Sequence, residues 1–187
     1  MTKKIKVRIS GRQFEVPSSC VRTDNYGESY LQFDAKESAS IVKQYVQQKY
    51  PHLKVWGASE RYAGGSSARV YMCNVDASPV EKEIYQDVND FGENFTAGKF
   101  DGMQDLYEYK GDGYTDDGIR ITNYCSYVFV NNKPKHGSAE CVKLTLQDLL
   151  DGKYTWGVLD LNASIAKAKY FGASDKTISE ALKMMSI

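Results

Sequence analysis

The sequence predicts an α+β fold with a mixed or antiparallel sheet and two packed helices, and two observations carry this prediction. Segments in which apolar and polar residues alternate, as in strands, recur between segments whose apolar residues repeat at helical spacing. No internal repeat or low-complexity linker divides the 187 residues. We therefore expect one α+β domain over residues 1–142 and a helical extension over residues 143–187 that packs on it.

The chain begins with a predicted β-hairpin over residues 4–16. Every second residue from Ile5 to Ile9 is apolar, whereas the residues between them are basic, and Ser10-Gly11 interrupts the run. One face of the hairpin should therefore be cationic. This face is a candidate nucleic-acid patch formed by Lys3, Lys4, Lys6, Arg8 and Arg12. Residues 17–27 are expected to form a loop.

Two helices are expected within the first domain. Asp34 and Glu37 have the spacing of an N-cap and its capping-box partner, and Pro51 should end this helix at Tyr50. Pro79 suits the first turn of the second helix, which should end near residue 92. Strands are expected over residues 30–33, 53–57, 68–75, 106–110, 119–122 and 124–131.

The C-terminal segment predicts a pair of helices over residues 162–171 and 177–185. Ser174 or Asp175 should cap the second helix, and residues 145–150 form one or two further helical turns. The second helix carries an apolar stripe formed by Ile178, Ala181, Leu182 and Met185. We expect this stripe to dock on the protein's own core, with self-association or a partner surface as the alternative.

Charge is balanced overall but separated along the chain. The 24 basic and 24 acidic residues give zero net charge, which argues against a general nucleic-acid binder. Residues 1–80 hold 12 Lys and Arg against 7 Asp and Glu, whereas residues 81–118 hold 3 against 11. This acidic segment is either a solvated surface or a patch that meets a basic groove on a partner.

Two loops and the tyrosines that flank them locate a candidate contact surface. The loop YAGGSS at residues 62–67 contains paired glycines, which permit positive φ, and the loop FDGMQD at residues 100–105 contains an Asp-Gly turn. Tyrosine supplies a large contact area at a low cost in entropy. The partner-binding candidates are Tyr62, Gly64, Gly65, Ser66, Asp101, Asp105, Tyr107, Tyr109, Tyr114, Asp116 and Asp117. Structural turns are the alternative interpretation of both loops.

The sequence shows no catalytic motif, and we expect a non-enzymatic protein without a metal or cofactor. The glycine pair lacks the Gly-Lys-Ser/Thr ending of a phosphate-binding loop. His136 lies five residues before Cys141, but a nucleophile and its base must meet within hydrogen-bond reach, which this spacing does not establish. The four cysteines form no Cys-x-x-Cys pair and are expected to be small buried thiols.

A cytoplasmic location is expected. The first residues contain charge but no apolar core of a secretion signal. No apolar run approaches the roughly 18 residues that a membrane span needs.

The order helix, YAGGSS loop, strand, helix and FDGMQD loop resembles the large polyvalent protein-associated domains, which are α+β modules of phages, plasmids and conjugative elements. The resemblance covers residues 34–131. It implies an accessory protein of a mobile element that protects incoming DNA from host defences. The implied function is inhibition of a host defence effector, with an anti-CRISPR protein that blocks a Cas nuclease complex as its sharpest form. A nucleic-acid-binding accessory protein is the alternative.

Overall fold

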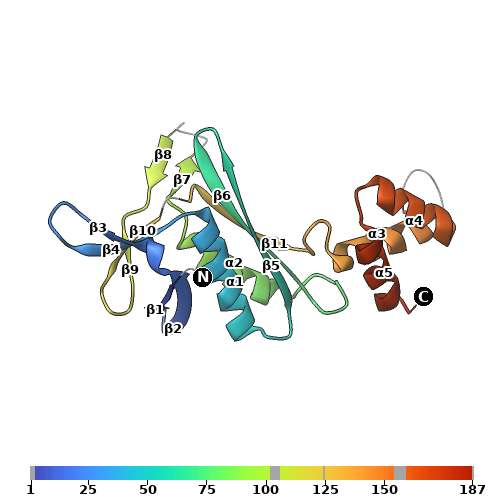
Figure 1. The fold of residues 1–187 in the computed structure, drawn as a ribbon, viewed down its shortest axis with the longest axis horizontal. Helices are drawn as coiled ribbons and strands as arrows, with labels where there is room; N and C mark the ends of the chain where they lie inside the picture. Colours follow the sequence, from blue (N-terminus) through green and yellow to red (C-terminus); the bar gives the residue numbers. More distant parts are fainter. Residues whose placement is uncertain (1–2, 102–105, 124, 154–158, 187) are drawn as a thin grey trace.

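A computed structural model describes residues 3–101, 106–123, 125–153 and 159–186 (Figure 1). Helices and strands are mixed in an α+β fold with antiparallel and parallel pairings, which confirms the predicted fold class. The described strands are β1 (Lys4–Ile9), β2 (Arg12–Pro17), β3 (Val21–Thr23), β4 (Ser29–Phe33), β5 (Lys54–Tyr62), β6 (Gly65–Cys73), β7 (Gly98–Asp101), β8 (Leu106–Tyr109), β9 (Gly113–Tyr114), β10 (Arg120–Asn123) and β11 (Tyr127–Asn132). The described α-helices are α1 (Ala35–Lys49), α2 (Lys82–Glu93), α3 (Ala139–Leu150), α4 (Leu161–Tyr170) and α5 (Asp175–Met184).

The β1–β2 hairpin forms as predicted and belongs to the main core. Ser10 and Gly11 have φ values of 53° and 75°, the pattern of a type I′ turn, whose twist matches that of the two strands. Phe14 and Val16 on β2 are buried in the same cluster as residues of α1 and α2. Removing this hairpin would therefore open the core of the domain.

Helix α1 begins and ends where the sequence predicts. The Asp34 carboxylate accepts hydrogen bonds from the N–H groups of Lys36 and Glu37, and Tyr50 is the C-cap. The helix packs on β5 and β6 and also contacts β2 and α2. Its Tyr45 ring stacks on Phe91 of α2, with 3.9 Å between ring centroids, so an aromatic contact joins the two helices.

The central sheet has the order β11-β6-β5 and is covered on one face. β5 runs antiparallel to β6, whereas β11 runs parallel to it. Helices α1 and α2 contact these strands from one side, where Val70, Met72 and Val130 are buried. The opposite side of this sheet carries the exposed side chains described below.

Several boundaries differ from the sequence prediction, and three of them concern α2, the β5–β6 turn and β3. Helix α2 begins at Lys82 and not at Pro79, because the N–H and C=O of Val80 are both bonded to the Asn132 side chain, at 2.6 and 2.8 Å. Strands β5 and β6 extend to Tyr62 and Gly65, so most of the predicted YAGGSS loop is strand. Residues 21–23, predicted as loop, pair with β4 as strand β3.

The last three helices form a unit with its own core, which we call the helical unit. The buried residues of its apolar core are Val142, Leu146, Ala168, Ile178 and Ala181. Helix α3 begins at Ala139, where Ser138 caps it by accepting a hydrogen bond from the Cys141 N–H, so the unit starts before residue 143. The apolar stripe of α5 packs against α3 and α4, so it docks on the core of the helical unit.

Polar contacts bridge the helical unit to the α+β domain. The Lys143 ammonium group donates to the Asp76 carbonyl at 2.9 Å, and Lys54 lies 3.9 Å from the Glu140 carboxylate. Figure 1 shows the three helices set to one side of the sheets, reached through the segment after β11. Within the described chain, no helix combines the length and the apolar character that a membrane crossing requires.

The predicted buried thiols are found at three of the four cysteines. Cys20, Cys73 and Cys125 are buried and unpaired, while Cys141 is partly exposed. Burial raises the pKa of Cys20 and of Cys73 to about 11, so both are uncharged at neutral pH.

Candidate partner-binding surface

The uncovered face of the central sheet exposes two aromatic rings on β11. Because side chains alternate along a strand and Val130 points into the core, Tyr127 and Phe129 point outward. They are 36% and 44% exposed. Their register partners on β6 are Ser67 and Arg69, so Arg69 lies on the same face.

These side chains contact one another in a fixed arrangement. The rings of Tyr127 and Phe129 stack with centroids 5.8 Å apart and planes inclined by 20°. The Arg69 guanidinium lies 5.6 Å from the Phe129 centroid and donates to the Glu60 carboxylate at 3.2 Å. The pairing register adds half-buried Tyr71 and Trp56 to the same row. We call Trp56, Arg69, Tyr71, Tyr127 and Phe129 the aromatic face.

A pocket of about 270 Å³ adjoins the aromatic face. Tyr127 and Phe129 line one side of it, and Thr96 and Lys110 line another. The Lys110 ammonium group donates to the Glu93 carbonyl at 2.8 Å, which holds this cation at the pocket. The surface therefore combines apolar rings, a hollow and cationic groups at its edge.

The β5–β6 turn extends this face at one end. Tyr62 is 44% exposed and is the register partner of Gly65, which places both on the side of the aromatic face. Gly64 has φ +90°, and a Cβ on Gly65 would lie 2.5 Å from the Ser126 hydroxyl oxygen. The positive φ of Gly64 therefore favours glycine in the turn, whereas a side chain at Gly65 would have to displace the Ser126 hydroxyl. Ser66 is buried, so of the predicted loop residues Tyr62 is the one that offers a side chain to a partner.

Several carboxylates of the acidic segment are engaged inside the protein. The Asp116 carboxylate accepts from the Gly11 N–H at 2.8 Å and so fastens its loop to the β1–β2 turn. The Asp87 carboxylate accepts from Lys49 at 2.6 Å and from the hydroxyls of Tyr45 and Tyr50. Burial alone would raise the pKa of Asp87, but these hydrogen bonds outweigh it and hold that pKa below its ordinary value. The acidic run is thus partly structural.

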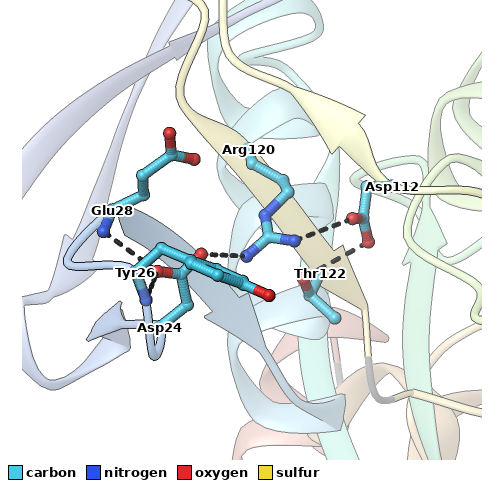
Figure 2. Close-up of polar contacts among 6 residues, drawn as sticks. All are labelled: Asp24, Tyr26, Glu28, Asp112, Arg120 and Thr122. Carbon is cyan, nitrogen blue, oxygen red and sulfur yellow. Dashed lines mark hydrogen bonds and ion pairs between the residues drawn. The ribbon is translucent and has the colours of Figure 1, made fainter.

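Asp112 belongs to a second internal cluster (Figure 2). The Arg120 guanidinium lies between the carboxylates of Asp24 and Asp112, at 3.3 and 3.5 Å, and over the ring of Tyr30. Asp24 also accepts from backbone N–H groups in the β3–β4 turn. The cluster ties that turn to β10, which is a bracing role.

The remaining predicted contact residues lie on other elements of the fold than the strands that form the aromatic face. Tyr114 and Asp117 are exposed near β9. The backbones of Asp101, Tyr107 and Tyr109 lie in the β7–β8 pair. The prediction for Asp105 falls outside the described residues.

The predicted basic patch on the hairpin is divided. Lys4 forms an ion pair with Glu15 at 3.1 Å, and the Arg12 guanidinium lies 5.5 Å from the Tyr45 ring centroid. Lys6 and Arg8 are exposed on the outer face of the hairpin, and Lys3 is exposed before β1. Two of the five predicted cations are therefore engaged within the protein.

His136 and Cys141 line a pocket of about 260 Å³ in the helical unit. Thr145, Ala168 and Phe171 also line this pocket, which is mostly apolar. Among the described residues, His, Cys, Asp and Glu side chains do not gather in groups of three or more that could hold a metal ion.

The aromatic face itself was not predicted from the sequence. From the sequence alone, Tyr71 and Tyr127 are expected to brace the core, since most tyrosines in strand patterns are at least partly buried. The alternation Tyr127, Val128, Phe129, Val130 does carry the signal, because it puts two rings on one side and two valines on the other.

Comparison with known proteins identifies the α+β domain. The family model for large polyvalent protein associated domain 29 matches residues 33–136, more than half of the chain. This match confirms the resemblance drawn from the two loops over residues 34–131, and it identifies a protein associated with phages or other mobile elements. No curated protein and no solved structure matches the chain.

Proposed function

This chain belongs to the large polyvalent protein associated domain 29 family, and from that premise we propose that it is a non-enzymatic binding protein that inhibits a host defence effector. A CRISPR-Cas nuclease complex is the leading candidate for the effector. The observation that carries the proposal is the aromatic face, an uncovered sheet surface on which the exposed rings of Tyr127 and Phe129 stack.

The chemistry of this face suits a protein partner. Aromatic residues and arginine are enriched at protein interfaces and supply most of the residues that dominate binding energy. Tyr127 and Phe129 offer flat rings whose positions are set by strand β11, so little conformational entropy is lost when a partner covers them. Tyr62 at the end of β5 would extend the contact along the sheet. The protein would act by occupying a functional surface of the effector.

Imitation of a phosphate backbone by the acidic segment is a second mechanism for the same function. The acidic segment offers fewer carboxylates to a partner than the sequence suggests, since Asp87, Asp112 and Asp116 are bonded within the protein. Exposed carboxylates such as Asp117 would then act on the encounter rate with a basic channel.

A phage-plating assay tests the proposal. The protein is expressed in bacteria whose CRISPR-Cas system targets the challenging phage, and plaques are counted. We expect the wild type to restore plaque formation. The double variant Tyr127→Ala, Phe129→Ala should give at least tenfold fewer plaques than the wild type. The matched control is Tyr26→Ala with Val75→Ala, which removes two exposed apolar side chains elsewhere and should restore plating fully.

Two outcomes would contradict the proposal. Failure of the well-expressed wild type to restore plating against a panel of CRISPR-Cas systems and other nuclease-based defences would remove the inhibitor function. Equal rescue by the Tyr127 and Phe129 double variant would keep the function but exclude the aromatic face as its contact surface.

A further inference from the structure

The connection between α4 and α5 is a four-residue turn fixed at both ends. Helix α4 ends in a Schellman motif: Gly172 has φ +90°, its N–H donates to the Lys169 carbonyl, and the Ala173 N–H donates to the Ala168 carbonyl. Ser174 then caps α5 by accepting from the Thr177 N–H at 3.1 Å. With both caps formed, the direction of α5 relative to α4 is set by the backbone.

Helix α3 supports both α4 and α5. It packs against both α4 and α5, and its Val142 and Leu146 fill the centre of the unit. Helices α4 and α5 share fewer contacts with one another than each of them shares with α3. Three helices with a glycine-containing turn before the third are the arrangement of a helix-turn-helix module, in which the helix after the turn reads DNA.

Helix α5 has one apolar and one polar face. Ile178 and Ala181 point into the unit and are buried. Lys176, Ser179, Glu180 and Lys183 are exposed at positions i, i+3, i+4 and i+7, so they form a single stripe along the helix. Lysine pairs with phosphate or guanine, serine hydrogen-bonds to several bases, and glutamate accepts from the cytosine amino group. The stripe thus carries the side-chain types that major-groove recognition uses.

The helical unit has a small positive net charge, which favours contact with the DNA backbone. Residues 133–186 contain eight Lys against six Asp and Glu, in contrast to the acidic run of residues 81–118. Asp175 at the start of α5 is neutralised by Lys169, at 2.6 Å, and Asp148 pairs with Lys153 at 2.7 Å. Lys176 and Lys183 remain exposed at the two ends of the stripe, where they can meet phosphates on either side of a groove.

From the turn, the packing and the charge together, we infer that the helical unit binds duplex DNA, with the exposed stripe of α5 in the major groove. This inference goes beyond the proposed inhibitor function and uses a different surface, because α5 lies outside both the matched family region and the aromatic face. The protein would therefore carry two binding surfaces, one for a partner protein and one for DNA.

Fluorescence anisotropy with a labelled random-sequence DNA duplex of about 25 base pairs tests the inference on the full chain, from 25 to 200 mM salt. We expect binding whose affinity falls with salt, by about 0.9 logarithmic units per decade of salt for each phosphate neutralised. The double variant Lys176→Gln, Lys183→Gln should bind at least tenfold more weakly at low salt, with a slope shallower by about two. Circular dichroism should show an unchanged helix content.

The matched control is Lys6→Gln with Arg8→Gln on the β1–β2 hairpin, which removes the same charge and should bind DNA like the wild type. Loss of binding in this control, with none in the α5 variant, would overturn the inference and support the hairpin as the DNA site. Absence of duplex binding by the wild type at 25 mM salt would also overturn it.

A second readout separates reading of bases from simple attraction of charge. Ser179→Ala removes a hydroxyl from the centre of the stripe without changing charge. Selection of duplexes from a randomised pool should give a sequence preference in the wild type that this variant alters. If the duplexes selected by the wild type and by Ser179→Ala both lack a sequence preference, major-groove recognition by α5 is excluded. The plating assay tests the inhibitor function and does not depend on DNA binding by α5. Failure of one proposal can therefore be distinguished from failure of the other.

Discussion

Two segments lie outside the matched family region, and the fold uses them in opposite ways. The β1–β2 hairpin precedes residue 33 but contributes Phe14 and Val16 to the main core, where Phe14 stacks on Phe91. The helical unit follows residue 136 and buries its apolar residues within itself. Position relative to a family boundary therefore does not tell whether a segment is structurally required. The location of its buried residues does.

The two cores also differ in kind. The α+β domain is held by large aromatic rings that connect elements distant in sequence, whereas the helical unit is held by alanines and aliphatic side chains on three consecutive helices. Aromatic side chains bury more area and stabilise long-range contacts strongly. We therefore expect the domain to be the more stable of the two, with the helical unit able to unfold while the domain stays intact.

Replacement of Phe91 by Ala should give the largest loss of stability. This ring stacks on Tyr45 and packs against Phe14 and Phe95, so its removal leaves a cavity that several elements share. We expect a loss of about 3 to 5 kcal/mol in the free energy of unfolding of the α+β domain. In NMR spectra recorded with increasing denaturant, the dispersed signals of the domain should disappear at a lower denaturant concentration than in the wild type, whereas the loss of the α3 to α5 signals should not shift. Simultaneous loss of both sets would show a single cooperative unit.

Leu146→Ala is the corresponding change in the helical unit. Leu146 is fully buried at the centre of the three helices, and its truncation should destabilise that unit by about 2 to 5 kcal/mol. Amide hydrogen exchange should accelerate in α3, α4 and α5 and stay unchanged in α1 and β6. Faster exchange in α1 would contradict the separation of the two cores.

The sequence predicted those features of the fold that depend on residues close together in sequence, namely helix caps and a tight turn. The Asp34 cap and the Ser10-Gly11 turn act within a few residues and are found as predicted, and Ser174 is the one of the two predicted candidates that caps α5. The predicted start of α2 at Pro79 was wrong, because the Val80 backbone is hydrogen-bonded to Asn132, a residue 52 positions away in sequence. Local propensity carries no information about such a partner.

The same limit explains what was missed in the candidate sites. Asp116 was predicted as a contact residue, but its bond to the Gly11 N–H depends on a loop and a hairpin that are 105 residues apart in sequence. The aromatic face could not be recognised either, because a strand pattern gives two faces without saying which one the helices cover. The docking of α5 on α3 and α4 depends in the same way on which apolar surface is nearest in space.

Asp87→Asn should have an intermediate effect within the α+β domain. The carboxylate binds Lys49, Tyr45 and Tyr50, so the variant should lose about 1 to 2 kcal/mol at pH 7. Because the pKa of Asp87 is lower in the folded protein, its contribution is present above the unfolded value of about 3.9 and is lost as the pH falls through the folded value. Chemical denaturation at pH 7 and at pH 3 should show the difference between wild type and variant shrinking at the lower pH. A constant difference would assign the effect to packing.

The smallest expected effect on stability comes from the contacts that bridge the two regions. Glu140→Gln combined with Lys143→Met removes the pair with Lys54 and the hydrogen bond to the Asp76 carbonyl. Partly exposed ion pairs contribute little, so the unfolding free energy of the α+β domain should change by less than about 1 kcal/mol. The orientation of the helical unit should nevertheless become more variable, since these polar contacts restrain it while neither apolar core does. Small-angle X-ray scattering of wild type and variant should show a larger radius of gyration and maximum dimension for the variant.

The control Lys153→Gln, which removes a cation within the helical unit, should leave both quantities unchanged. A rigid variant with unchanged scattering would mean that the segment after β11 alone fixes the arrangement. DNA held by α5 would then lie at a constant position relative to any partner on the aromatic face.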